Sequence, residues 1–137
     1  MRAAFPFQKI LFAFCVFIGL LLAARALYSG KLQYLFLLWN IFLAWIPFAI
    51  SSLFNKMFLK SRWKQGLIFC CWLAFFPNAL YIVTDLVHLG RESTVPKWFD
   101  VLLLFSSSVV GLMMAFISLH RVEIYLHKTV HKKIHSA

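Results

Sequence analysis

The stretch LQYLFLLWNIFLAWIPFAISSLFN (residues 32–55) joins Lys31 to Lys56 without a single charged residue. A helix needs about 20 apolar residues to cross the hydrocarbon core of a bilayer, so this stretch has the length of one crossing. Gaps of similar length separate other charged residues of the 137-residue chain, and they lie between Lys9 and Lys31 (interrupted by Arg25), Lys64 and Asp85, and Asp100 and Arg121. The sequence therefore predicts four transmembrane helices, at about 10–29, 32–54, 66–89 and 98–120.

The composition agrees with this assignment. Apolar residues make up 63% of the chain, aromatic residues 18% and charged residues only 13%, and the mean hydropathy is +0.84. Too few polar side chains remain to cover a soluble surface, which excludes a soluble enzyme, a disordered chain and a disulfide-stapled secreted domain. The strict alternation of β-barrel strands is absent. The expected fold is an all-α, polytopic transmembrane helical bundle of one domain, residues 1–121, followed by a basic tail.

Lysine and arginine are distributed unevenly between the two sides of this bundle. With the N-terminus inside, the inner side carries Arg2, Lys9, Lys56, Lys60, Arg62, Lys64, Arg121, Lys128, Lys132 and Lys133, and the outer side carries Arg25, Lys31, Arg91 and Lys97. The positive-inside rule then predicts that both termini lie in the cytoplasm, and the expected location is the cell inner (plasma) membrane, as the family resemblance given below implies. The net charge of +10 predicts attraction to anionic lipids at the inner face. Without a soluble basic domain, no nucleic-acid partner is expected.

The first span and the three cysteines can both be explained without a functional site. The first span resembles a signal peptide that ends at Ala24-Arg25-Ala26, which leaves cleavage as an alternative to a retained helix.

The three cysteines lie within apolar spans and lack the C-x-x-C spacing of redox or metal sites, so they are expected to be packing groups. They are Cys15, Cys70 and Cys71.

Polar residues recur at helical spacing in three of the four spans, where lipid would not tolerate them. The third span has Asn78, Tyr81, Asp85, His88 and Glu92 at spacings of three and four, which predicts one shared helical face. The fourth span has Asp100, Ser107, Gly111 and Ser118, and the second has Asn40, Ala44, Pro47, Ser51 and Asn55. In the expected orientation these stripes overlap in the outer half of the membrane. The candidate ligand-binding residues are Asn40, Asn78, Tyr81, Asp85, His88 and Asp100.

Each part of this stripe also has a structural interpretation. Small and weakly polar residues serve close helix packing, and Asn40 and Asn78 could simply bond to each other. Pro77 predicts a kink whose freed carbonyl needs a partner, although proline kinks are common in transmembrane helices. Asp85 and His88 are the stronger functional candidates, because ionisable groups in a membrane are costly. They are candidate acid–base residues and, with Glu92, weak candidate metal ligands; no cofactor is expected.

The basic C-terminal segment, residues 122–137, forms a separate feature. Apolar residues recur every four positions in it, beside a stripe of histidines and several lysines. This pattern predicts that the fourth helix continues as a cationic amphipathic helix that lies on the inner leaflet. A histidine stripe at this spacing could also bind a metal or respond to pH.

Three strings resemble an uncharacterised family of bacterial multi-pass inner-membrane proteins, known as a domain of unknown function. They are LWNIFLAWIP (38–47), FFPNALYIVTDLVHL (75–89) and WFD (98–100). The resemblance covers about residues 32–121 and implies no activity. Members typically continue with further hydrophobic helices, which implies that the C-terminal part of the family is missing here. The family's pattern falls on Trp39, Asn40, Pro47, Pro77, Asn78, Tyr81, Thr84, Asp85, His88, Trp98 and Asp100.

The sequence leaves three functions open. The leading hypothesis is a small ligand-binding or accessory component of the cell envelope or of a transport assembly, which works as a homo-oligomer or with a membrane-protein partner. The second is a membrane-embedded enzyme that acts on a lipid-linked or envelope substrate through Asp85 and His88. The third is a purely structural membrane scaffold.

Overall fold

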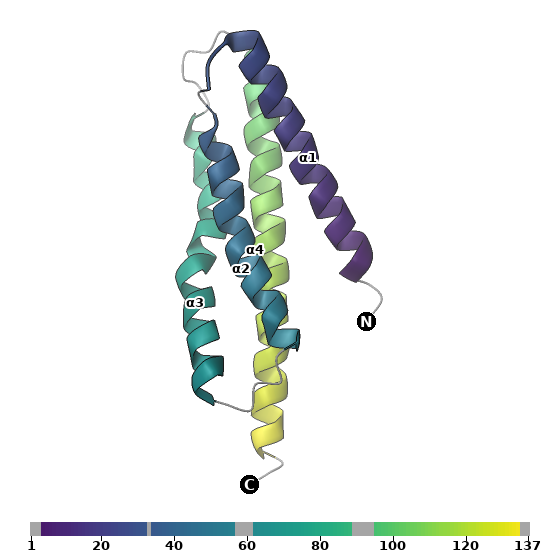
Figure 1. Cartoon of the computed structure of the whole chain (residues 1–137), viewed down its shortest axis with the longest axis vertical. Coiled ribbons are helices and arrows are strands. Elements are labelled where there is room, and N and C mark those ends of the chain that lie inside the picture. Colours follow the sequence, from purple (N-terminus) through teal and green to yellow (C-terminus); the bar gives the residue numbers. More distant parts are fainter. Residues whose placement is uncertain (1–3, 33, 57–61, 89–94, 135–137) are drawn as a thin grey trace.

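The computed structural model describes residues 4–32, 34–56, 62–88 and 95–134, which form one antiparallel helical bundle (Figure 1). Its elements are α1 (Ala4–Ser29), α2 (Phe36–Lys56), α3 (Arg62–Tyr81), the 3-10 helix η1 (Ile82–His88) and α4 (Lys97–Ile134). With α3 and η1 taken together, four segments are long and apolar enough to cross a membrane: Phe7–Ser29, Phe36–Phe54, Arg62–His88 and Lys97–Thr129. The expected all-α bundle of about four transmembrane helices is confirmed.

The helix α4 lies at the centre of the bundle. In its most apolar part 56% of the residues are buried, against 22%, 22% and 17% in the other three spans. Its small and polar face points inward, since Asp100, Ser107, Gly111 and Ser118 are all buried. Small residues let helix backbones approach closely, which explains why this face packs against α2, α3 and η1.

Two proline-containing helices are joined to α4 by hydrogen bonds. In α2 the carbonyl of Pro47 accepts a hydrogen bond from Ser118 Oγ at 3.0 Å, and Trp72 Nε1 of α3 donates to the same Ser118 Oγ at 2.6 Å. Arg121 Nη1 donates to the carbonyl of Phe48 at 3.3 Å. Neighbouring helices thus provide hydrogen bonds around the proline turn of α2, as the bilayer core requires.

The third span changes helix type instead of breaking at its proline. The sequence predicts a kink at Pro77, but α3 continues through Pro77 to Tyr81 and only then tightens into the 3-10 helix η1. Ile82, Val83 and Thr84 are consecutive β-branched residues, which are poor α-helix formers. The Thr84 hydroxyl also donates to the Tyr81 carbonyl, three residues back, at 2.6 Å.

A close approach holds this transition in place. A Cβ atom at Gly111 of α4 would overlap the side chain of Ile82 and lie 3.1 Å from the carbonyl oxygen of Ala79. Ser108 Oγ also lies 3.3 Å from the Ile82 carbonyl, to which it can donate. The glycine therefore lets α4 lie directly against the junction between α3 and η1.

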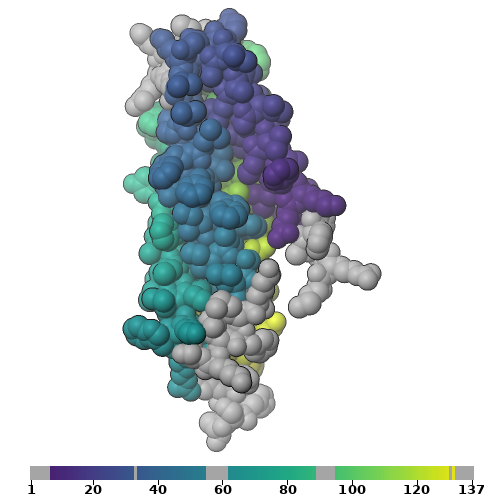
Figure 2. Space-filling model, viewed as in Figure 1, coloured from purple at the N-terminus to yellow at the C-terminus, as the bar shows by residue number. Residues whose placement is uncertain are grey.

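The helix α1 packs on the bundle along one apolar stripe. Leu11, Ile18, Leu22 and Arg25 are buried and Cys15 is half-buried, at spacings of three and four along the helix. Toward its N-terminal end α1 leans away from the other helices (Figures 1 and 2). The remaining residues of α1 are as apolar as the stripe itself, so the sequence alone could not separate its two faces. Cys70 and Cys71 are free and exposed on α3.

The C-terminal segment continues α4 without a break as far as Ile134. Val122 is buried in a cluster with Phe54 and Trp72, and the rings of Phe54 and Tyr125 lie 4.9 Å apart. The fourth helix therefore continues beyond residue 121, as expected, and its first turns past this point pack against α2 and α3. The His127 and His131 rings lie 4.4 Å apart further along α4.

Candidate functional site

A buried ion pair joins α1 to α4 near the connection between α1 and α2. Arg25 Nε lies 2.7 Å from Asp100 Oδ1, and Nη2 lies 3.3 Å from Oδ2. The guanidinium of Arg25 also lies 4.1 Å from the centre of the Tyr34 ring. Arg25 and Asp100 are 3% and 5% exposed. The two-point geometry and the aromatic face below it make this a specific, well-compensated pair.

A second buried carboxylate, that of Asp85, lies at the same end of the bundle. Asp85 is on η1 and 7% exposed, and one of its oxygens accepts a hydrogen bond of 2.7 Å from Asn40 Nδ2 of α2. Among the residues that the structure describes, no cation forms an ion pair with it. Asp85 therefore differs from Asp100, because its partner is a neutral amide.

The change of helix type explains why Asp85 points inward. A 3-10 helix has three residues per turn, so residues three apart share a face. Ala79, Ile82 and Asp85 are all buried at this spacing, and His88 is half-buried at the next position. An α-helical period would instead have grouped Asp85 with Asn78 and Tyr81, as the sequence predicts.

His88 lies against the start of α2. Its ring meets that of Phe36 edge to face, with centroids 5.1 Å apart, and its backbone carbonyl accepts a hydrogen bond of 3.4 Å from the Tyr34 hydroxyl. Tyr34 thus contacts both Arg25 and the end of η1. This links the ion pair to the element that carries Asp85.

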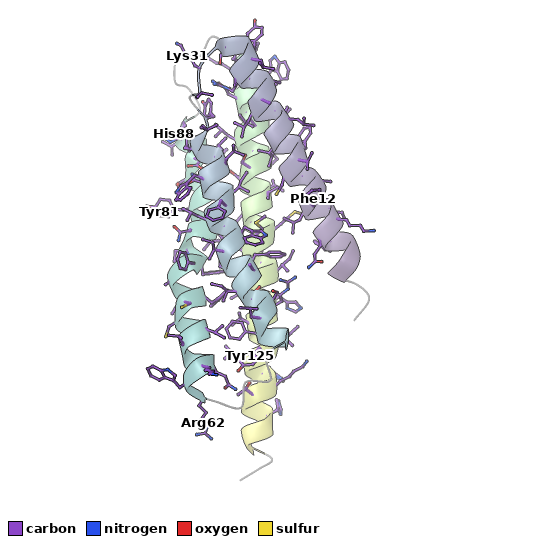
Figure 3. The ribbon with its side chains drawn as sticks, viewed as in Figure 1. Phe12, Lys31, Arg62, Tyr81, His88 and Tyr125 are labelled. Atoms are coloured by element: carbon purple, nitrogen blue, oxygen red, sulfur yellow. The ribbon has the colours of Figure 1, made fainter. Side chains whose placement is uncertain are left out.

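Two of the predicted site residues lie elsewhere. Asn78 Nδ2 donates to the Phe75 carbonyl of its own helix at 3.2 Å, not to Asn40. The side chain of Tyr81 is 69% exposed and points away from the bundle (Figure 3). Glu92 lies outside the described residues. The residues predicted to share one face of the third span are thus divided between different surroundings. Asp85 bonds to Asn40, and His88 follows Asp85 by three residues on η1. Asp100 pairs with Arg25.

Comparison with known proteins covers most of the chain. Residues 39–137 match the family described as Protein of unknown function (DUF1361). The chain belongs to this family. No curated protein and no solved structure matches it. The match extends to residue 137, beyond residue 121, where the resemblance was expected to end. This DUF1361 protein is thus a multi-pass membrane protein of unknown activity.

The family match includes one of the two buried carboxylate sites completely. Asn40, Asp85 and His88 all lie within residues 39–137, whereas Arg25, the partner of Asp100, lies before them. The Asn40–Asp85 pair is therefore formed by the DUF1361 domain alone. The Arg25–Asp100 pair attaches α1 to that domain.

Arg25 and Tyr34 were not among the residues predicted for the site. Arg25 is the only charged residue between Lys9 and Lys31, and it is expected at the same membrane level as Asp100, so charge pairing across spans could have identified it. A cavity of about 220 Å³ also lies between α1 and α2, lined by Arg25, Lys31 and Tyr34 together with apolar residues. None of the six candidate residues lines this cavity.

The described residues hold no group of three or more histidine, cysteine or acidic side chains that could bind a metal ion. Asp85 and His88 share a face of η1, but Glu92, the third weak candidate, lies outside the described residues. The arrangement is better suited to hydrogen bonding and charge recognition, since a buried carboxylate accepts hydrogen bonds from several donors at once.

Proposed function

We propose that this DUF1361 protein is a small ligand-binding or accessory component of the cell envelope or of a transport assembly, and that Asp85 binds the ligand. The observation that carries the proposal is the hydrogen bond between Asp85 and Asn40. A buried carboxylate whose described partner is a neutral amide keeps at least one lone pair for a further donor. A ligand with an ammonium group or several N–H donors can donate a hydrogen bond to this carboxylate.

The structure of the bundle supports binding more than conduction. The central helix α4 packs against α2, α3 and η1, and its own side chains Leu103, Leu104 and Val110 are fully buried. In the part of the chain that the structure describes, fully buried side chains thus occupy the centre of the bundle. A transport role would therefore be that of a partner in a larger assembly or of a homo-oligomer.

A thermal unfolding series with ammonium probes tests the proposed ligand chemistry. Purified protein in detergent is melted in sodium chloride, ethylammonium chloride and tetramethylammonium chloride at equal ionic strength. We expect ethylammonium, which has N–H donors, to raise the Tm, because a ligand that binds only the folded state stabilises it. Tetramethylammonium has the same charge without the donors and should have a smaller effect.

Two variants locate this effect. Asp85→Asn should abolish the rise in Tm, whereas Glu123→Gln, which removes an exposed carboxylate on α4, should preserve it. If ethylammonium does not stabilise the wild-type protein, the proposed ligand class is wrong. If Asp85→Asn responds like the wild type, Asp85 is not the binding group.

A membrane enzyme is the second candidate, favoured by the three-residue spacing of Asp85 and His88 on η1. This spacing places an acid and an imidazole on one face of the helix, within reach of one substrate. Comparison of lipid and envelope extracts from wild-type, deletion, Asp85→Asn and His88→Ala cells tests this function. Accumulation of the same compound in all three altered strains supports the enzyme, and unchanged extracts in both point variants contradict it.

The proposed location is the inner membrane with both termini in the cytoplasm, on the basis of the excess of lysine and arginine on one side. Ser93→Cys, in a background where Cys15, Cys70 and Cys71 are alanine, reports the side on which the segment between η1 and α4 lies. Labelling by an impermeant thiol reagent in intact cells is expected. Labelling only after lysis would invert the topology and place the Asp85 site at the cytoplasmic side.

A further inference from the structure

A second, larger cavity of about 620 Å³ lies between α3 and α4, toward the end of the bundle opposite the Asp85 site. Its walls are formed by Phe69, Trp72 and Phe76 of α3 and by Leu119 and Leu126 of α4. We refer to this cavity as the α3–α4 groove. A hollow of this size and composition is typical of sites for apolar ligands.

The relative level of α3 and α4 follows from one hydrogen bond. Trp72 Nε1 donates to Ser118 Oγ at 2.6 Å, so these two residues lie at the same level of two antiparallel helices. Because both helices rise by about 1.5 Å per residue, Arg62, ten residues before Trp72, lies near the level of His127. His127 lines the groove, so the groove ends near the level of Arg62, which lies at the start of α3 (Figure 3).

Arg62 also lies on the correct side of α3. It precedes Phe69 by seven residues, or two helical turns, and therefore shares the face that lines the groove. Gly66 lies on the same face between them, and a Cβ atom at this position would have no neighbour within 4 Å. Within the described residues, the face of α3 between the groove and Arg62 is thus open at Gly66, and the exposed Arg62 lies about 10 Å from Phe69 along the helix axis.

From this arrangement we propose that the α3–α4 groove binds one phospholipid, with an acyl chain between the aromatic side chains and an anionic headgroup on Arg62. The planar guanidinium matches phosphate geometry, and basic sites between transmembrane helices favour anionic lipid headgroups. Glu123 also lines the groove, but its carboxylate faces the His120 ring at 3.5 Å. The net charge of +10 disfavours a second copy of the chain as the occupant and favours an anionic lipid.

Quenching of Trp72 by brominated lipids tests the site directly, because Trp72 forms part of its wall. The other four tryptophans are at least half exposed and are replaced by phenylalanine: Trp39, Trp45, Trp63 and Trp98. The protein is placed in phosphatidylcholine vesicles with increasing fractions of dibrominated phosphatidylglycerol or dibrominated phosphatidylcholine. We expect dibrominated phosphatidylglycerol to quench Trp72 at about fivefold lower mole fraction, since one cation near the membrane surface contributes that factor.

The matched variants are Arg62→Gln and Lys64→Gln. Both remove one positive charge from the start of α3, but Lys64 lies about 200° around the helix from Arg62 and thus away from the groove. Arg62→Gln should make the two lipids equally effective, whereas Lys64→Gln should retain the preference. Equal quenching by both lipids in the wild type, or equal effects of the two variants, overturns the proposal.

Native mass spectrometry of the unaltered protein, released from the same vesicles, provides a second measurement that does not depend on the tryptophan replacements. A monomer that retains one phosphatidylglycerol molecule supports the proposal, and loss of that lipid in Arg62→Gln assigns it to this site. A dimer without retained lipid would show that a second copy occupies the groove and would contradict the proposal.

Discussion

The two buried carboxylates at the α1–α2 end of the bundle have opposite environments. Asp100 is held by the guanidinium of Arg25 and belongs to a contact between α1 and the rest of the protein. Asp85 is held by the amide of Asn40, within the DUF1361 domain, and no ion pair to it is found among the described residues. Similar burial thus accompanies two different partners: a cation from α1 for Asp100, and a neutral amide from α2 for Asp85.

Removal of Arg25 should produce the largest loss of stability in this comparison. Arg25→Gln leaves the buried carboxylate of Asp100 without a cation, and breaking a buried pair in this way costs about 3–5 kcal/mol. Unfolding of the purified protein in a mixed-micelle SDS titration, followed by circular dichroism, measures the loss.

The double variant Arg25→Gln/Asp100→Asn is the control for this prediction. Replacing both charges should recover part of the lost stability, because a neutral pair leaves no unpaired charge in the bundle. A loss of less than about 1 kcal/mol for Arg25→Gln would mean that this ion pair does not attach α1. Asp100 and Asp85 would then not differ in what they contribute to stability.

Gly111→Ala should have the next largest effect, since Gly111 positions the element that carries Asp85. The added Cβ would overlap Ile82, so α4 and the α3–η1 junction must separate, at a cost of about 1–3 kcal/mol. The same SDS titration measures the loss, with Gly19→Ala of α1 as the control, because a Cβ there meets nothing within 4 Å. Equal effects of the two substitutions would mean that the close approach of α4 to η1 is unimportant.

Most of the fold was predictable because the gaps between charged residues have the length of a membrane crossing. The inward faces of the second and fourth spans were also predicted correctly, since Ala44, Pro47, Ser51 and Ser107 are polar or small against an apolar background and all are buried. The packed face of α1 was not predictable, because leucine and phenylalanine surround the whole helix. The continuation of α4 past residue 121 was predictable from apolar residues that recur every four positions in 122–137.

The candidate site was only partly predictable for a different reason. A period of 3.6 residues per turn throughout the third span would place Tyr81 and Asp85 on one face, but η1 has three residues per turn, which separates them. The three β-branched residues at 82–84 were the available signal for this change. Helical periodicity within single spans also could not reveal the Arg25–Asp100 pair, which joins residues 75 positions apart.

Two neutral hydrogen bonds near the middle of the bundle show what pairs without charge contribute to stability. Ser118→Ala removes the acceptor of Trp72 and the donor to the Pro47 carbonyl, and side-chain hydrogen bonds within membranes average about 0.6 kcal/mol each. We therefore expect a loss of about 1 kcal/mol in the SDS titration. Ser52→Ala, whose hydroxyl bonds only to Ala49 of its own helix, is the control and should have a smaller effect.

Asp85→Asn should change stability least, by less than about 0.5 kcal/mol, although Asp85 is nearly as buried as Asp100. The substitution keeps an oxygen that can accept the hydrogen bond from Asn40 and removes a charge that has no cationic partner among the described residues. The SDS titration and the ethylammonium melting series are read together for this variant. A protein of unchanged stability that no longer responds to ethylammonium identifies a binding group. A loss of several kcal/mol, as for Arg25→Gln, would instead show that the negative charge of Asp85 is required for folding, and the two carboxylates would then share one structural role.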